Sequence, residues 1–303
     1  MYFLDGRSQD DVARVLGTSR SNVSRMLAAA RAQGIVEIRV HDQTVRATEL
    51  EQALRERFGL AQVRVAAFRP GADMRAAAGD LAAHWLDDCL RDGQVLGLSW
   101  GTSLQAMVAA MAVDKPRSVD VLPLVGGLST AKSLVAGQEL VRDLAGRLGA
   151  TYRYLHAPAL LRSEAARDAL LAEPAISDVL QRASSADVAM VGIGTVGSGS
   201  TDDIIEGLGL SGAEYQEFLD EGPVGDACCR FFDAGGRPIR GVVHDRVLAV
   251  ELDHLRRIPM VMGVATGAEK AAGVLGALRG NVIDGLITDA GLALTLLSGP
   301  GDE

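Results

Sequence analysis

Cysteine is scarce in this chain of 303 residues, and its pattern excludes two kinds of cross-linked protein. The three cysteines, Cys89, Cys228 and Cys229, are odd in number and lack a C-x-x-C spacing, so they predict neither a disulfide framework nor a zinc site. The five histidines are scattered without the spacing of metal ligands. We therefore expect no metal, no cofactor and a reducing, cytoplasmic location.

Long apolar runs are also missing. No run approaches the roughly 18 residues needed to cross a bilayer. Asp5, Arg7, Asp10 and Asp11 occur where a signal peptide would need an apolar core. The sequence therefore predicts no membrane partner and no secretion. With 48% hydrophobic residues and 35 glycines, the chain is expected to fold compactly as one large domain and one small one.

Lysine is the third shortage, because only three of the 30 basic residues are lysines. They are Lys115, Lys132 and Lys270. Lys270 follows an apolar strand at the start of a predicted helix, and the use of lysine where arginine predominates indicates a compact point charge for a phosphate. Imine chemistry with a sugar aldehyde and chance retention on a solvated helix are the alternatives.

Residues 9–34 have the layout of a helix-turn-helix. Gln9–Leu16 is predicted to be a short helix that ends at Gly17, and Ser19 is predicted to cap a second helix over Arg20–Gln33. The predicted buried residues of the two helices are Val12, Ala13, Val15, Leu16, Val23, Met26, Leu27 and Ala30. In such a motif the second helix enters the DNA major groove with its N-terminal residues against the base edges.

Six polar residues near the start of this second helix are expected to face outward. They are Ser19, Arg20, Ser21, Asn22, Ser24 and Arg25. Arginine can form two parallel hydrogen bonds to guanine, and asparagine can form two to adenine. Serine hydroxyls suit phosphates or bases. The first 40 residues hold six arginines and four acidic residues, a local excess of positive charge in a chain of net charge −9. The sequence therefore predicts binding to a double-stranded DNA operator. A solvated surface helix and a protein-interaction module are the alternatives.

The ends of this domain raise two further expectations. A helix-turn-helix normally has another helix ahead of these two, but only Met1–Leu4 remain of it before Gly6, so we expect a truncated first helix. A late start codon or loss of the helix would explain this, and loss would weaken the domain's core. After the second helix, Gly34 is expected to end it and Ile35–Val40 to form a short strand.

The rest of the chain alternates between strands and helices. After a polar linker, a charged helix over Glu49–Phe58 is expected either to couple the domains or pair protomers, or to be a solvated connector. Expected strands are 62–68, 95–99, 119–125, 152–155, 188–193, 227–232, 260–265 and 282–287. Expected helices are 72–90, 102–112, 134–148, 163–171, 175–182, 211–221, 269–278 and 290–297. This alternation predicts an α/β fold with a doubly wound, mostly parallel sheet.

Ligands in this architecture bind beyond the carboxyl ends of the strands, so the strand-to-helix junctions are the candidate site. Gly101, Thr102 and Ser103 open a helix and offer hydroxyls and backbone N–H groups to an anion. The other informative junctions are Gly126–Gly127, Gly192–Thr195 with the polar loop after it, and Glu269–Lys270. Each glycine alone is equally explained by turn chemistry, and no complete dinucleotide fingerprint is present. Together the four junctions indicate a small anionic ligand.

Several long motifs occur along the chain in this order: SQDDVARVLGTSRSNVSRMLAAARAQGIVEIRV, the Gly101–Ser103 turn, LPLVGG, LVRDLAGRLGATYRYLHAPA, VAMVGIGTVGS, VGDACCRFFDAGGRPI, GVATGAEKAAGVLGALRG and LITDAG. Together they resemble the SorC family of bacterial transcription regulators. The resemblance implies a helix-turn-helix domain at 1–45, a linker helix at 46–58 and an effector-binding domain at 59–303. This last domain is similar in fold to sugar-phosphate isomerases and amino-sugar deaminases. It further implies a homodimer or homotetramer whose DNA affinity is set by a phosphorylated sugar or polyol.

The resemblance also implies which residues bind the effector. The phosphate turn falls on Gly101, Thr102 and Ser103, where Ser103 replaces the second threonine of many relatives. The rest of the implied pocket is Gly126, Gly127, Gly194, Asp226 and Lys270. Gln138 and Asp289 are weaker candidates, since a helix start and an acid after a strand both have structural explanations.

Two functions are consistent with these features. The first is an effector-gated regulator of carbohydrate metabolism, in which the ligand binds one conformational state better than another. The second is a sugar-phosphate isomerase or deaminase on the same sheet. Proton transfer next to a carbonyl needs a positioned base. Asp202 and Asp203 are separated from Gly194 by a run of small residues, no histidine lies near it in sequence, and Asp226 alone is better suited to hold sugar hydroxyls. Binding without turnover is therefore the favoured interpretation.

Overall fold

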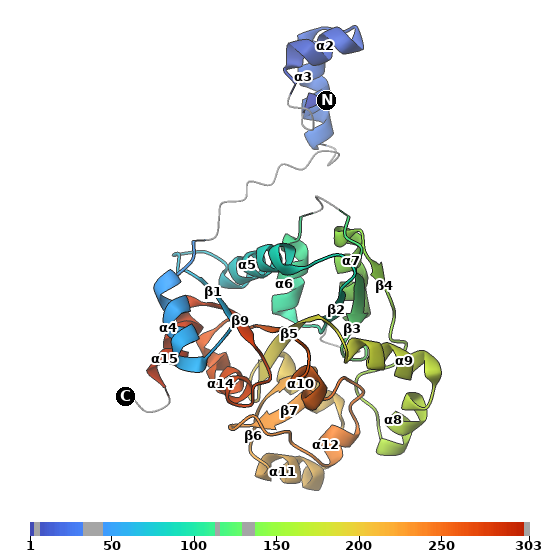
Figure 1. The fold of residues 1–303 in the computed structure, drawn as a ribbon, viewed down its shortest axis with the longest axis vertical. Coiled ribbons are helices and arrows are strands. Elements are labelled where there is room, and N and C mark those ends of the chain that lie inside the picture. The colour runs from blue at the N-terminus through green and yellow to red at the C-terminus, as the bar shows by residue number, and fades with distance from the viewer. Residues whose placement is uncertain (3–6, 33–44, 113–115, 129–136, 300–303) are drawn as a thin grey trace. The chain divides into compact units, whose positions relative to one another are not determined.

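A computed structural model describes residues 1–2, 7–32, 45–112, 116–128 and 137–299 (Figure 1). The chain forms two compact units, residues 1–43 and residues 44–303. Among the described residues, no helix combines the length and the apolar character needed to cross a membrane.

The smaller unit contains the two predicted helices, α2 (Gln9–Leu16) and α3 (Arg20–Ala32). Gly17 ends α2 in the left-handed conformation, with φ of 62°. The backbone N–H of Asn22 donates to the Ser19 hydroxyl at 3.2 Å, so Ser19 caps α3 as expected. Val12, Ala13 and Val23 are the buried residues that hold the two helices together.

Three residues predicted to be buried in this unit are instead exposed. Val15, Leu16 and Met26 are 57%, 48% and 53% accessible. The helical period identifies an apolar face correctly, but burial also requires a neighbouring element to cover that face. The predicted strand Ile35–Val40 and the helix end at Gly34 lie outside the described residues.

The larger unit is a parallel sheet with helices on both faces (Figure 1), which confirms the predicted fold class. The strand order is β1-β9-β8-β5-β2-β3-β4, and every neighbouring pair in it is parallel. The strands of this order are β1 (Gln62–Ala66), β2 (Val95–Leu98), β3 (Asp120–Pro123), β4 (Thr151–Tyr152), β5 (Val188–Thr195), β8 (Val261–Val264) and β9 (Gly285–Asp289).

Two hydrophobic cores fill the two sides of this sheet. Helices α5 (Met74–Cys89), α6 (Thr102–Ala110) and α7 (Gly137–Leu148) contribute to one core. The other core includes residues of α4 (Thr48–Phe58), α9 (Pro174–Ala183), α14 (Ala271–Arg279) and α15 (Ala290–Ser298). The runs that are apolar throughout therefore form central strands that bury both faces, as their composition predicts.

The region after β5 departs most from the predicted elements. Residues 227–232 are not one strand but parts of a hairpin, β6 (Pro223–Ala227) and β7 (Arg230–Asp233), in which β6 also pairs antiparallel with β5. The expected polar loop after Thr195 contains a helix, α10 (Ser200–Gly207). The remaining elements are α8 (Glu164–Leu171), α11 (Gly212–Asp220), α12 (Val242–Asp245), α13 (Leu252–Leu255) and the 3-10 turn η1 (Ala268–Lys270). Of these, α12 and α13 were not predicted.

Helix α4 is part of the larger unit. Its Leu54 is fully buried, and the nearby Glu51 is 3% accessible. One Glu51 carboxylate oxygen accepts from the Val65 backbone N–H at 3.0 Å and from Arg46 Nε at 2.8 Å. Burial alone would raise the pKa of Glu51, but these bonds hold it below the ordinary value of 4.5. This carboxylate therefore fastens α4 and the residues before it to the edge strand β1.

We expect Glu51→Ala to lower the free energy of unfolding by about 2–3 kcal/mol, because it leaves the Val65 N–H and a partly buried arginine without their partner. Urea denaturation measures the change.

Because the pKa of Glu51 is lower in the folded state, the contribution of Glu51 to the free energy of unfolding is present above the unfolded-state pKa. This contribution is lost as the pH falls through the folded-state value. Glu49→Ala, on the exposed side of α4, is the control, and an equal loss in both variants would contradict this role.

Candidate functional site

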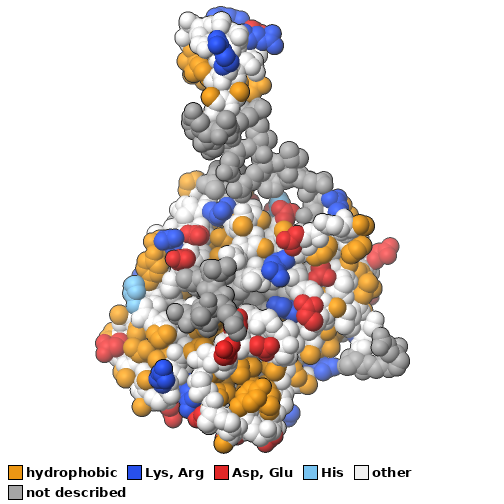
Figure 2. All heavy atoms as spheres, turned by 180° about the vertical axis from the view of Figure 1, so that it is seen from behind, with side chains coloured by type: hydrophobic (Ala, Val, Ile, Leu, Met, Phe, Trp, Pro, Cys, Tyr) orange, Lys and Arg blue, Asp and Glu red, His pale blue; other side chains and the backbone are white. Residues whose placement is uncertain are grey.

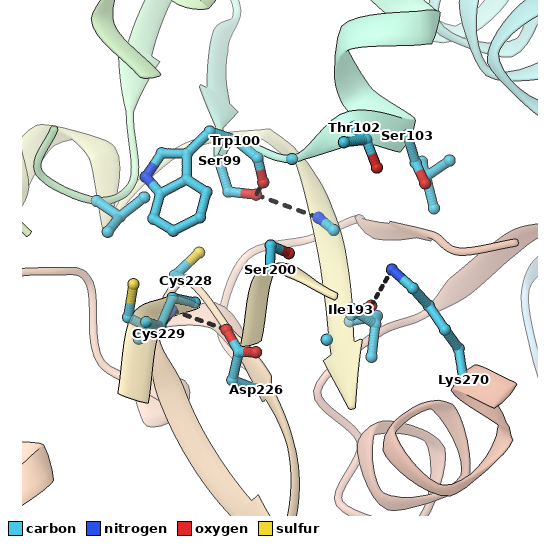
Figure 3. Close-up of a pocket in the computed structure, with 16 residues that line it drawn as sticks. Ser99, Trp100, Thr102, Ser103, Ile193, Ser200, Asp226, Cys228, Cys229 and Lys270 are labelled. Atoms are coloured by element: carbon cyan, nitrogen blue, oxygen red, sulfur yellow. Dashed lines mark hydrogen bonds between the residues drawn. The ribbon is translucent and has the colours of Figure 1, made fainter. Parts of the chain in front are cut away.

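A pocket lies where the central strands end (Figure 3). Its walls come from the ends of β2, β5 and β8, from the first turns of α6 and α10, and from the β6–β7 hairpin. The lining residues include six of the ten candidate effector-binding residues, Gly101, Thr102, Ser103, Gly194, Asp226 and Lys270. Parallel strands place their carboxyl ends at one edge of the sheet, which explains why residues so far apart in the sequence meet here.

The first turn of α6 forms one side of the pocket. Gly101 precedes the helix with φ of 139°, a conformation that favours glycine, and no side chain among the described residues caps the helix there. The first backbone N–H groups of a helix have no partner within the helix, and they carry its positive partial charge. Thr102 is exposed and Ser103 is buried, and both line the pocket. This turn has the donors that an anion requires.

Lys270 approaches the same space from η1 (Figure 3). Its Nζ donates to the Ile193 carbonyl at 3.3 Å, and its own carbonyl accepts from the Thr195 hydroxyl at 3.1 Å. Burial lowers the pKa of Lys270, while the carboxylates of Asp226 and Glu269 oppose this effect. An anion in the pocket would stabilise the charged ammonium group further, because opposite charges favour the ionised form.

Asp226 supplies the buried acid of the pocket. One carboxylate oxygen accepts from the Thr201 hydroxyl at 2.9 Å, and the other accepts from the Cys229 backbone N–H at 3.2 Å. Burial raises the pKa of Asp226, and these two bonds and Lys270 counteract it. A methyl group at Gly194 would lie only 2.0 Å from Asp226 Oδ1 and 2.1 Å from Thr201 Oγ1. Gly194 is therefore needed to make room for the acid.

The structure does not bring Gly126, Gly127 and Gln138 to the pocket lining. Gly126 packs against the backbone of 158–159, and Gly127 exchanges backbone hydrogen bonds with 157 and 159. Gln138 accepts from the Leu155 N–H at 2.9 Å, while its buried Nε2 has no partner among the described residues. These contacts match the alternative explanation by turn and packing requirements. Gly126 still touches the site indirectly, since its carbonyl accepts from Trp100 Nε1 at 3.2 Å.

Asp289 also has a structural role. One of its oxygens accepts from the Leu292 N–H at 3.1 Å and caps α15, and the other accepts from the Gly267 N–H at 2.6 Å. It thereby fixes the loop that carries η1.

Several residues of the pocket were not predicted to be site residues. They include Ser99, Trp100, Ser200, Cys228 and Cys229. Ser99 and Trp100 directly precede the phosphate turn, so their position at the end of a strand was the available signal. The cysteine pair gave no signal, because nothing in the sequence marked it as the turn of a hairpin.

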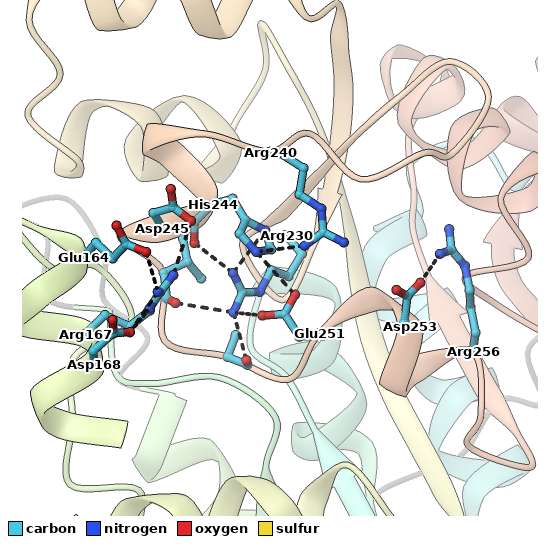
Figure 4. Close-up of polar contacts among 12 residues, drawn as sticks. Glu164, Arg167, Asp168, Arg230, Arg240, His244, Asp245, Glu251, Asp253 and Arg256 are labelled. Atoms are coloured by element: carbon cyan, nitrogen blue, oxygen red, sulfur yellow. Dashed lines mark hydrogen bonds and ion pairs between the residues drawn. The ribbon is translucent and has the colours of Figure 1, made fainter. Parts of the chain in front are cut away.

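A buried arginine holds this hairpin in place (Figure 4). Arg230 is 4% accessible and donates to the carbonyls of His244, Val247 and Ala249 at 2.9, 3.3 and 3.0 Å. It also forms an ion pair with Glu251 at 2.7 Å. Burial and the neighbouring Arg230 lower the pKa of His244. This network connects β7 to the segment of residues 244–251.

The pocket lining combines several hydrogen-bond donors with one acidic side chain. In the part of the chain that the structure describes, no group of three histidine, cysteine or acidic side chains could hold a metal ion. The donors in the lining are amide N–H groups, hydroxyls and one ammonium group, and the carboxylate of Asp226 is an acceptor. This set matches a ligand that carries both an anionic group and hydroxyls.

All six predicted DNA-contacting residues are exposed on the smaller unit. Arg20 lies 3.9 Å from Asp10, and the Asn22 side chain donates to the Thr18 hydroxyl at 2.9 Å. Figure 2 shows basic side chains gathered on the smaller unit, whereas both signs of charge are mixed on the visible face of the larger unit. The exposed start of α3 therefore offers arginine and serine donors to a partner.

Comparison with known proteins identifies relatives of both units. The Sugar-bind family model, described as "Putative sugar-binding domain", matches residues 42–298. The sorbitol operon regulator of Klebsiella pneumoniae is 32% identical over 303 residues, covering 98% of this chain and 95% of the relative. The deoxyribonucleoside regulator of Bacillus subtilis is 30% identical over 301 residues, with the same shares of coverage.

The fold matches as well as the sequence. The crystal structure of the full-length sorbitol operon regulator from Klebsiella pneumoniae has a TM-score of 0.76 and 31% identity, and the match covers 98% of this chain and 95% of that one. These relatives are transcriptional regulators and not enzymes, which supports the regulator interpretation over the isomerase or deaminase alternative.

We expect Gly194→Ala to lower the melting temperature and the free energy of unfolding by about 1–3 kcal/mol, because the added methyl group would displace Asp226 and Thr201. Thermal unfolding measures this. Gly146→Ala is the matched control, since a methyl group there would meet nothing within 4 Å and alanine favours the helix. If the two variants melt alike, the close packing around Gly194 is not needed.

Proposed function

The chain belongs to the SorC/DeoR-type family of sugar-binding transcriptional regulators, and on this basis we propose that a phosphorylated sugar or polyol controls its binding to a DNA operator. The observation that carries the proposal is the pocket where the first turn of α6, Lys270 and Asp226 meet. The relatives named for sorbitol and for deoxyribonucleosides agree with genes of carbohydrate metabolism as targets.

Different residues of the pocket are suited to the phosphate group of the effector and to its hydroxyl groups. In our proposal the phosphate binds the N–H groups and hydroxyls of Thr102 and Ser103 and the Nζ of Lys270, because three kinds of donor converge there. The sugar hydroxyls then face Asp226, whose carboxylate has acceptor capacity beyond its two internal bonds. Neutral sugars would lack the group for which most of these donors are suited.

The smaller unit is proposed to read the operator. Arg20, Ser21, Asn22, Ser24 and Arg25 lie on the exposed first turns of α3, the part of a helix-turn-helix that reaches base edges. Together with Ser19 they form the proposed DNA-contacting surface. We propose residues 1–45 as the reader, 46–58 as the connecting helix and 59–303 as the effector domain.

Regulation requires that the effector bind one state of the protein better than another. A coupling of about 1–3 kcal/mol between the two sites changes operator occupancy several-fold. We propose that the chain acts as a homodimer or homotetramer, because an operator with two half-sites is read by paired helices.

A screen of sugar and polyol phosphates should raise the melting temperature of the wild-type protein for one or a few compounds, since a ligand that binds the folded state stabilises it. Lys270→Met should abolish the shift and the effector's influence on DNA binding, while DNA affinity without effector is retained. The unphosphorylated sugars are the matched controls. A stabilising ligand that works equally well without its phosphate would exclude the proposed phosphate turn.

Arg20→Ala combined with Arg25→Ala should weaken DNA binding and flatten its dependence on salt, with the slope reduced by about 0.9 for each phosphate that the variant no longer neutralises. Fluorescence anisotropy of a labelled duplex across a salt series measures both effects. Arg162→Ala combined with Arg279→Ala removes the same charge from exposed positions of the larger unit and is the control. Equal effects in the two double variants would show that only net charge matters.

A further inference from the structure

The turn between β6 and β7 is built from two residues that do not favour its conformation. Ala227 pairs with Arg230, so Cys228 and Cys229 are the two central residues. Both have positive φ, 54° and 60°. Hairpin turns of this kind prefer Asn-Gly, and a left-handed conformation costs an ordinary residue roughly 1–2 kcal/mol. The turn itself therefore gives no reason for two cysteine side chains.

The side chains of this turn have a place in the pocket. Both cysteines line it, and they are 5% and 1% accessible. In Figure 3, Cys228, Cys229 and Trp100 lie on the side of the pocket opposite Thr102, Ser103 and Lys270. A ligand whose phosphate binds the first turn of α6 therefore extends its carbon chain toward the thiols.

The thiols are uncharged and weakly polar. Burial raises the pKa of Cys228 to about 12 and that of Cys229 well above its ordinary value, so neither is a thiolate at neutral pH. Neutral thiols are weak hydrogen-bond partners and behave as small apolar groups. Their main effect on a ligand is therefore to limit the space in this part of the pocket, and they contribute little hydrogen bonding to its hydroxyls.

The turn is also fixed in position. The backbone N–H of Cys229 donates to Asp226, and Arg230 holds the next strand through three carbonyls and Glu251 (Figure 4). A ligand that is too long therefore meets a wall that is anchored on both sides. Anchored contacts of this kind discriminate by size better than flexible ones do.

We propose that Cys228 and Cys229 form the end wall of the effector pocket and set the maximum length of the phosphorylated sugar or polyol that it accepts. This inference rests on the proposed function, because the length is measured from the phosphate turn. It assigns to the cysteines a role in specificity that is separate from the recognition of the phosphate.

The test compares probes of increasing length: inorganic phosphate, glycerol 3-phosphate, ribose 5-phosphate and glucitol 6-phosphate. Calorimetric titration of the full-length protein gives the affinity for each. In Cys228→Ala combined with Cys229→Ala, the affinity for the longest probe relative to glycerol 3-phosphate should rise about ten-fold or more, as expected when space for a further carbon is created. Affinity for inorganic phosphate should change less than about two-fold, since the phosphate turn is untouched.

A second variant tests the wall in the other direction. Cys229→Met should reduce the affinity for the longest probe that the wild type binds, again without affecting inorganic phosphate. Cys89→Ser is the control, because Cys89 lies on α5 and does not line the pocket. The two pocket variants thus keep the test decisive if one of them fails to fold.

The outcomes separate the two proposals. If the wild type binds phosphate and sugar phosphates but the variants keep the same order of preference, the end wall is refuted and the effector pocket stands. If the wild type binds none of the four probes, the proposed function fails and the end wall fails with it. A parallel change in all affinities, inorganic phosphate included, would refute the end wall by showing that the cysteines support the fold of the pocket and do not set its length.

Discussion

The contact between the buried carboxylate of Asp226 and the bare backbone of Gly194 is the constraint on which the pocket depends. The acid can occupy that position because β5 has no side chain there, and it is stabilised by the Thr201 hydroxyl and the Cys229 N–H. These bonds join the strand, the start of α10 and the hairpin in one arrangement. A buried carboxylate is costly unless such partners are present, so the partners and the acid are required together.

Sequence patterns predicted both the sheet and the position of the strand-to-helix junctions that line the pocket, and one physical reason explains both. Strands buried on both faces are apolar throughout, and their carboxyl ends meet at one edge, so Thr102 and Lys270 could be placed together from the sequence alone. The glycines at 126 and 127 show where this reasoning stops. A glycine after a strand leaves room either for a ligand or for another backbone segment that passes close by. The sequence does not distinguish these two explanations, and the contacts with the backbone of 157–159 support the second.

Two departures of the structure from the predicted elements have different origins. The hairpin turn was not predicted because Cys228 and Cys229 are not residues that favour a turn, and their conformation is maintained by Arg230 and Asp226 from outside it. The exposure of Val15 and Met26 was not predicted because periodicity describes one helix and not its neighbours. In both cases the missing information was tertiary, and at residues 227–232 it also made the predicted single strand wrong.

The position of Trp100 gives the molecule an optical property. Its indole lines the pocket, whereas Trp85, the other tryptophan of the chain, is 5% accessible and packed within the core on the α5 side of the sheet. Tryptophan emission from the protein therefore has one shielded source and one source in direct contact with whatever enters the site. The chain carries its own spectroscopic reporter of occupancy, with an internal reference, and needs no attached dye.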